Sequence, residues 1–148
     1  MLNFKKWLTN NMIMDNMIME NSAQEFILSF QSSVNAQPNP IDDNFYYIDG
    51  DTLVKFKMTP SFLKPNAVHL DQIHAVPTKT GAGLRFMQKL TKLADQTNTW
   101  LELNSVPLNT RERIPTKKLT NFYKSFGFTS LQKDEQNTMI RRPQSLRS

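Results

Sequence analysis

Two of the four glycines in this 148-residue chain, Gly81 and Gly83, are separated by a single residue. They follow an alternating stretch and precede an amphipathic one, which places them in a turn between a strand and a helix. A scarce residue concentrated there indicates a backbone that must approach something closely. Amides at a helix N-terminus, together with the helix dipole, bind anions. Lys79 and Thr80 add a cation and a hydroxyl, so the turn suits a diphosphate group, with an ordinary tight turn as the alternative.

Other phosphate loops and metal chemistry do not fit the sequence. The dinucleotide fingerprint G-x-G-x-x-G requires glycine at position 86, where the chain has Phe86. The loop G-x-x-x-x-G-K-[ST] does not occur. The chain has no cysteine and two histidines, which excludes a disulfide scaffold, a thiolate zinc site and a cysteine nucleophile. We expect no metal.

The elements that position this turn alternate between strand and helix patterns. In residues 67–75, Val68 and Leu70 fall on one side of the predicted strand and His69 and Asp71 on the other. We expect strands at residues 45–48 and 52–58, joined as a hairpin, and at 67–75, 100–104, 128–131 and 138–140. Helices are predicted at residues 22–30, 84–96 and 116–126.

The segments between these elements are less regular. The Met-rich segment 1–20 is interpreted as a core strand followed by a turn, and prolines exclude regular structure from residues 31–44. The whole order predicts one mixed α/β domain over residues 1–140, including the segment 1–20, followed by a basic tail at 141–148.

Charge is concentrated toward the end of the chain. Residues 1–110 hold nine Lys or Arg and ten Asp or Glu, whereas residues 111–148 hold nine and three. A basic region of this kind binds polyanions or is a solvated tail. No apolar run approaches the ~20 residues that span a bilayer. Asn10, Asn11, Asp15 and Asn16 interrupt any export signal. We therefore expect a cytoplasmic protein without membrane contact.

Two segments together resemble a known family. Residues 73–83 (IHAVPTKTGAG) resemble the acyl-CoA-binding motif of the GNAT N-acetyltransferase superfamily, Gln/Arg-x-x-Gly-x-Gly/Ala at the end of a strand and the start of a helix. Residues 119–128 (LTNFYKSFGF) resemble the family's late helix, with its Leu/Phe-Tyr-x-x-x-Gly-Phe pattern. Residues 100–104 occupy the place of its fifth strand. The resemblance covers about residues 67–130.

The resemblance implies a mixed, mostly antiparallel sheet whose fourth and fifth strands are splayed into a V-shaped cleft for acetyl-CoA. Thr78 stands where the family usually has Gln or Arg, Lys79 where glycine is frequent, and Thr116 where an asparagine often contacts the cofactor. Pantetheine would pair along the fourth strand, and an amide near its middle would polarise the thioester carbonyl. The implied cofactor-binding residues are Ile73, Ala75, Thr78, Lys79, Thr80, Gly81, Ala82, Gly83 and Thr116.

The implied reaction is direct attack of a primary amine on the thioester, without a covalent enzyme intermediate. By resemblance, Tyr123 would protonate the leaving thiolate, because a phenol is protonated at neutral pH. The amine must lose a proton to attack, and His69, Asp71 and Glu102 are the candidate bases. The alternative for Tyr123 is a core aromatic, and for the other three ordinary surface or core-edge positions.

Three functions follow from these observations. The first is an acetyl-CoA-dependent N-acetyltransferase with an unidentified small-molecule or protein amine as acceptor. The second is a non-catalytic module on the same fold that binds nucleic acid or an acidic protein through residues 111–148. The third is a structural protein that keeps the fold without the cofactor.

Overall fold

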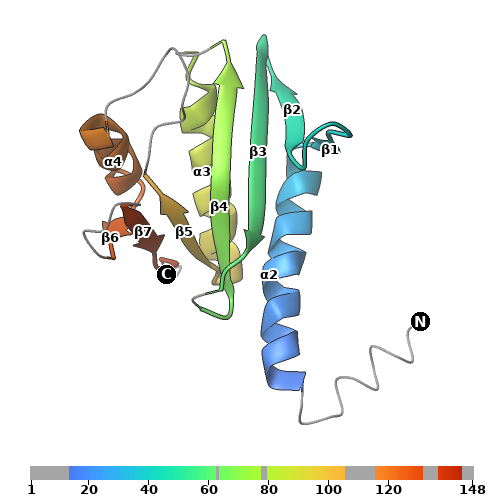
Figure 1. Cartoon of the computed structure of the whole chain (residues 1–148), viewed down its shortest axis with the longest axis vertical. Helices are drawn as coiled ribbons and strands as arrows, with labels where there is room; N and C mark the ends of the chain where they lie inside the picture. The colour runs from blue at the N-terminus through green and yellow to red at the C-terminus, as the bar shows by residue number, and fades with distance from the viewer. Residues whose placement is uncertain (1–13, 63, 78–79, 106–115, 132–136, 145–148) are drawn as a thin grey trace.

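The computed structural model describes residues 14–62, 64–77, 80–105, 116–131 and 137–144. One sheet has the strand order β1-β2-β3-β4-β5-β7-β6 (Figure 1). Its strands are β1 (Gln37–Pro38), β2 (Phe45–Asp49), β3 (Thr52–Pro60), β4 (Ala67–Val76), β5 (Trp100–Asn104), β6 (Thr129–Ser130) and β7 (Thr138–Arg141). The described helices are α2 (Met14–Ser33), α3 (Ala82–Thr97) and α4 (Thr116–Lys124).

Only β4 and β5 are parallel neighbours, and every other described strand pair is antiparallel. A parallel pair needs a crossover, and α3 supplies it. The predicted class, mixed α/β with a mostly antiparallel sheet, is confirmed.

The described helices pack on one face of the sheet. Phe30 of α2, Phe56 of β3 and Phe86 of α3 meet edge-on or tilted, with ring centroids 5.2–5.5 Å apart. All three rings are fully buried. In Figure 1, α3 runs behind β4, so the reader looks onto the opposite face. The alternation of β3 follows from this arrangement, because Val54 and Phe56 turn toward the helices and the residues between them turn away.

The strand and helix pattern predicted most of these elements. The β2–β3 hairpin, β4, α3 and β5 form within two residues of the expected bounds. Gly127 ends the turn after α4 with a positive φ of 95°, as a glycine C-cap does.

Three expectations were wrong. Residues 14–21 form the start of α2 rather than a strand and turn, because this Met- and Glu-containing stretch has no Gly or Pro to interrupt a helix. Gln37 and Pro38 form β1 although Pro38 lacks an N–H, which an edge strand tolerates. Arg141 belongs to β7 and not to the tail, and its side chain is buried.

Candidate active site

The glycine turn between β4 and α3 has the backbone that the sequence predicted. Gly81 adopts φ 83° and ψ 0° immediately before the helix, a conformation that favours glycine. Its carbonyl accepts the first helical hydrogen bond, from the Arg85 amide at 3.0 Å. Thr52 fixes the turn from β3 by donating its hydroxyl to Thr80 Oγ1 at 2.8 Å.

Two amides of this turn, those of Ala82 and Gly83, stand at the start of α3. The first N–H groups of a helix have no intrahelical partner, and no described group accepts a hydrogen bond from Ala82 or Gly83. A Cβ placed on Gly83 would meet nothing within 4 Å. Thr78 and Lys79 lie outside the described residues, so part of the predicted cradle is not seen.

Arg85 adds a cation beside this turn. Its guanidinium donates from Nε to Asp49 Oδ2 at 2.8 Å and from Nη1 to the Thr80 carbonyl at 3.3 Å. The side chain is nearly half exposed, so an anion on the helix N-terminus can reach it. Arg85 was not among the predicted site residues, although a basic residue in the first turn of the helix after the glycines is a signal in the sequence.

The two central strands separate after a short pairing. β4 and β5 pair from Ala67↔Trp100 to Leu70↔Leu103. β4 then continues to Val76 along β3, while β5 is held by β7. The splayed strands implied by the resemblance are therefore present.

The register irregularity at Lys57/Met58 lies opposite the point where the strands separate. Asp71 has no partner on β3, because Met58 pairs with Leu70 and Lys57 with Gln72. Such a bulge bends a strand and re-aims its side chains.

Beyond that point, no strand among the described residues pairs with β4 on the side where β5 would otherwise continue, and we call this side its free backbone edge. The predicted pantetheine contacts Ile73 and Ala75 lie on this stretch. Both side chains pack against the core on the helix side.

The three candidate bases come together on the face opposite the helices. His69 Nδ1 lies 2.8 Å from Glu102 Oε1, and His69 Nε2 lies 3.8 Å from Asp71 Oδ1. Ser61 donates its hydroxyl to Glu102 Oε2 at 2.8 Å, and Thr59 donates to Asp71 Oδ2 at 3.0 Å. The parallel register His69↔Glu102 aligns the first pair, so residues 33 positions apart form one hydrogen-bonded group.

Burial divides the roles within this group. Glu102 is 4% exposed, so its charge depends on the two groups that hydrogen-bond to it. The side chains of His69 and Asp71 are 20% and 35% exposed, so a molecule on this face of the sheet can touch them. A carboxylate accepting from Nδ1–H leaves the lone pair of a neutral imidazole on Nε2.

Tyr123 lies on the other side of the sheet from this group. Its ring packs against Phe122 and Phe128, with centroids 5.4 and 5.9 Å away, and it belongs to the helix-covered core. Burial raises the pKa of its hydroxyl to about 12. No described contact joins Tyr123 to His69, Asp71 or Glu102. Thr116 begins α4, and its side chain lies outside the described residues.

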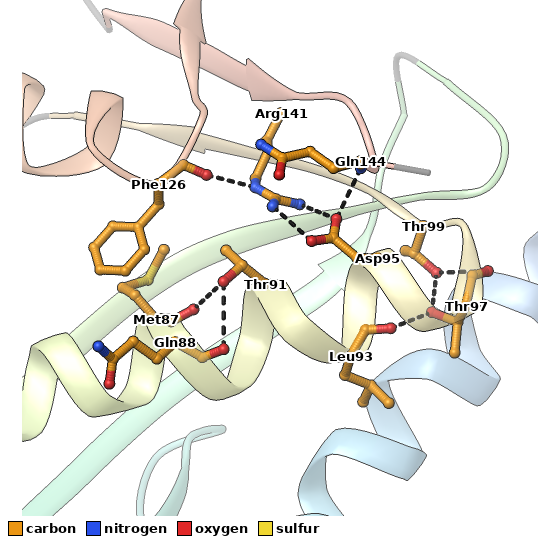
Figure 2. Close-up of polar contacts among 10 residues, drawn as sticks. All are labelled: Met87, Gln88, Thr91, Leu93, Asp95, Thr97, Thr99, Phe126, Arg141 and Gln144. Carbon is orange, nitrogen blue, oxygen red and sulfur yellow. Dashed lines mark hydrogen bonds and ion pairs between the residues drawn. The ribbon is translucent and has the colours of Figure 1, made fainter. Parts of the chain in front are cut away.

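Two polar contacts hold α4 against the rest of the chain. Near its middle, the Thr120 hydroxyl lies 2.8 Å from Ser105 Oγ and accepts from the Asn137 amide. At its end, Arg141 donates from Nε to the Phe126 carbonyl at 2.6 Å (Figure 2).

The second contact continues to α3 through an ion pair. Arg141 Nη1 and Nη2 donate to the two oxygens of Asp95 at 2.7 and 3.0 Å, as Figure 2 shows. The backbone N–H of Gln144 donates to Asp95 Oδ1 at 2.8 Å. Burial would raise the pKa of Asp95, but these hydrogen bonds and the Arg141 charge outweigh it and hold that pKa below its usual range.

This ion pair was not predicted, because Arg141 was expected in the C-terminal tail. The alternation of Met139 and Arg141 on one face of a short strand was the available signal. Arg141 is one of the nine cations of residues 111–148 and is already neutralised within the fold, so it adds nothing to the basic region for binding a polyanion.

Among the residues described, no helix is long and apolar enough to cross a membrane. No group of His, Asp and Glu in the same residues is arranged to hold a metal ion.

The sequence matches no protein-family model and no curated protein. Three solved structures are similar in chain path. The anti-CRISPR protein AcrVA5 is 15% identical, with 66% of this chain and 96% of that chain covered and a TM-score of 0.48. AtaTR bound with AcCoA is 15% identical, with 68% and 65% covered and a TM-score of 0.41. An acyl-CoA N-acyltransferase from Pseudomonas aeruginosa is 12% identical, with 90% and 94% covered and a TM-score of 0.42. Each TM-score is below 0.5, so the function proposed below rests on this chain's own residues.

Proposed function

We propose that this chain is an acetyl-CoA-dependent N-acyltransferase of the GNAT type, which moves an acetyl group directly to a primary amine. One observation carries the proposal: β4 and β5 separate at Leu70 and Leu103, beside the His69–Asp71–Glu102 group, and β4 continues from there to the glycine turn. The helix-covered face and the opposite face therefore meet at this separation. An acetyl donor bound on one face and an acceptor amine bound on the other can react there.

The residues present fit acetyl-CoA, which supplies an activated acetyl thioester. The amides of Ala82 and Gly83 and the Arg85 guanidinium would hold the diphosphate, as helix N-termini hold anions. The predicted contributions of Thr78, Lys79, Thr80, Gly81 and Thr116 remain part of this proposal. The free backbone edge at Ile73 and Ala75 would pair with the amide-containing arm in the manner of an added strand. An N–H on the same edge would polarise the thioester carbonyl.

His69 is the proposed base. Glu102 accepts Nδ1–H, which fixes the ring and leaves Nε2 to take the proton from the acceptor's ammonium group. Asp71, 3.8 Å from Nε2, stabilises the imidazolium that results. The neutral amine then attacks the thioester carbonyl, the C–N bond forms as the C–S bond breaks, and the second proton of the nitrogen passes to solvent.

Tyr123 is the proposed acid. Its hydroxyl is protonated at neutral pH because its pKa is raised to about 12, so it can give a proton to the leaving thiolate. The ring contacts with Phe122 and Phe128 set the direction of the phenol. The two proton transfers would then take place on opposite faces of the sheet.

The first test is binding and turnover with acetyl-CoA. Calorimetry should detect saturable binding of acetyl-CoA, and a thiol-release assay should detect turnover with a panel of amines. Tyr123→Phe should lower kcat at least tenfold, since general acid catalysis contributes about 10²–10⁴, while the Kd for acetyl-CoA changes less than threefold. Equal losses in kcat and Kd would contradict the acid role.

The second test separates the base from its neighbours. His69→Gln should lower kcat/KM at least about tenfold, and Glu102→Gln should lower it to a smaller extent, while both variants leave acetyl-CoA binding intact. Asp43→Asn is the matched control, because Asp43 is exposed and has no described partner. A kcat/KM of His69→Gln equal to that of Asp43→Asn would exclude His69 as the base.

A further inference from the structure

We call the face of the sheet opposite the helices the open face. Its side chains change along the strands, from acidic at one end to apolar at the other. Its acidic end is the His69–Asp71–Glu102 group. Its other end is apolar, because Ile48 lies opposite Leu53 and Leu53 opposite Val76. The side chains of Ile48 and Val76 are 64% and 47% exposed. The polar residues between these ends carry the inference.

Cations gather between the two ends. Lys55 and Lys57 are two residues apart on β3, so they point to the same face, and Lys55 lies directly opposite His74 of β4. Lys57 lies opposite the neutral Gln72. Neither Lys57 nor His74 has a hydrogen-bond or ion-pair partner in the described part of the chain.

One carboxylate, that of Asp42, forms a weak ion pair with this group. Asp42 Oδ2 lies 3.8 Å from Lys55 Nζ, and both side chains are more than a third exposed. Exposed pairs of this kind contribute about 0–1 kcal/mol. Like charges placed side by side on a sheet repel one another, so an anion laid across Lys55 and Lys57, beside His74, would stabilise them.

The register fixes how far this row lies from the proposed base. His69 is opposite Thr59 on β3. Lys57 and Lys55 are two and four residues from Thr59 along the strand, which corresponds to about 7 and 13 Å at ~3.3 Å per residue. A single small molecule can therefore touch His69 and the cations at once.

We infer that the acceptor is a primary amine that carries a carboxylate or phosphate about 7–13 Å from its nitrogen. The inference rests on the proposed function, since it assigns the acceptor of that reaction. The amine lies among His69, Asp71 and Glu102, where carboxylates attract the arriving ammonium ion. The anionic group lies on Lys57, Lys55 and His74.

Four short peptides test the charge preference. Gly-Gly-Glu-amide, Gly-Gly-phosphoserine-amide, Gly-Gly-Gln-amide and Gly-Gly-Arg-amide share one N-terminal amine and differ in the charge of the third residue. We expect kcat/KM for the glutamate peptide to exceed that for the glutamine peptide about 3- to 10-fold, as for one charge pair at ~7 Å in a partly solvated site. The arginine peptide should be the poorest. The phosphoserine peptide distinguishes a phosphate requirement from a carboxylate one.

Variants locate the preference. Lys57→Gln should reduce the ratio of kcat/KM for the glutamate peptide to that for the glutamine peptide to below twofold. Lys92→Gln is the matched control, because Lys92 is an exposed lysine on α3, on the opposite side of the sheet. Raising the salt concentration should also shrink the ratio.

The outcomes separate the two proposals. If acetyl-CoA binds and all four peptides react equally, or if Lys57→Gln leaves the ratio unchanged, the acceptor inference is wrong and the transferase proposal stands. If acetyl-CoA does not bind, the transferase proposal is wrong. Calorimetric titration of the peptides into the protein then decides the charge preference: tighter binding of the glutamate peptide that Lys57→Gln abolishes supports an anion site on the open face, and equal binding overturns it.

Discussion

Replacing Asp95 with alanine should destabilise the protein by about 3 kcal/mol. The substitution leaves the Arg141 guanidinium, 3% exposed, without the carboxylate that accepts from it at 2.7 and 3.0 Å. Removing one partner of a buried ion pair costs about 3–5 kcal/mol. The lower end of this energy range applies because the Asp95 side chain is 18% exposed and water reaches the ion pair. For a chain of this length, each kcal/mol lowers Tm by about 2–4 °C, so we expect a loss of about 6–12 °C.

Thermal unfolding followed by circular dichroism measures this loss, and a double-mutant cycle assigns it. Arg141→Met keeps much of the side-chain packing but leaves Asp95 and the Phe126 carbonyl without the guanidinium that donates to them. In Asp95→Ala/Arg141→Met no charge is left buried, so the double variant should lose less stability than the sum of the single ones. Asp43→Ala, which removes an exposed carboxylate, should change stability by less than about 0.5 kcal/mol. An Asp95→Ala variant that unfolds at the same temperature as Asp43→Ala would refute the reasoning.

The other predictions concern two glycines and two titrating groups. In a denaturant titration, Gly127→Ala should lower stability by about 1–2 kcal/mol, because φ is 95° and the new Cβ would lie 3.0 Å from Gln144 Nε2. Gly83→Ala, with nothing within 4 Å of its Cβ, should instead raise stability by about 0.4–1 kcal/mol in the same titration. Because the pKa of Asp95 is lowered in the folded state, its contribution is present above the unfolded pKa and lost as pH falls. The Tm difference between wild type and Asp95→Asn should therefore narrow below about pH 4. With the pKa of Tyr123 at about 12, kcat should show no loss from its ionisation between pH 7 and 10.

Most of the fold could be predicted from patterns of neighbouring residues in the sequence. The hairpin of β2 and β3 follows from two alternating runs around Asp49-Gly50-Asp51, and α3 from the spacing of Met87, Leu90 and Ala94. These patterns depend on neighbours in the sequence, so the sequence predicts them. The start of α2 at Met14 was missed because a helix without a clean apolar stripe has no periodic signal to read.

The site was predictable in its residue types but not in its connections. His69, Asp71 and Glu102 were singled out separately, yet their hydrogen bonds depend on which residue of β5 lies beside His69. That register is set by the packing of β4, α3 and β5 and not by any local pattern. A shift of one residue in β5 would turn Glu102 into the core and expose a leucine, so the buried Leu101 and Leu103 determine where the carboxylate lies.

The same alternation explains why one short region can serve both halves of the proposed reaction. In β5, Leu101 and Leu103 pack toward the helices while Glu102 faces the other way. In β4, the unpaired residue Asp71 offsets the alternation, so Ile73 packs on the helix side while Asp71 joins His69 on the open face. The bulge lies where β5 stops pairing with β4. It therefore brings the free backbone edge of β4 and the His69–Asp71–Glu102 group within a few residues of one another. Shortening β4 by deleting Asp71 would restore regular pairing with β3, and we expect it to abolish transfer while the sheet still folds.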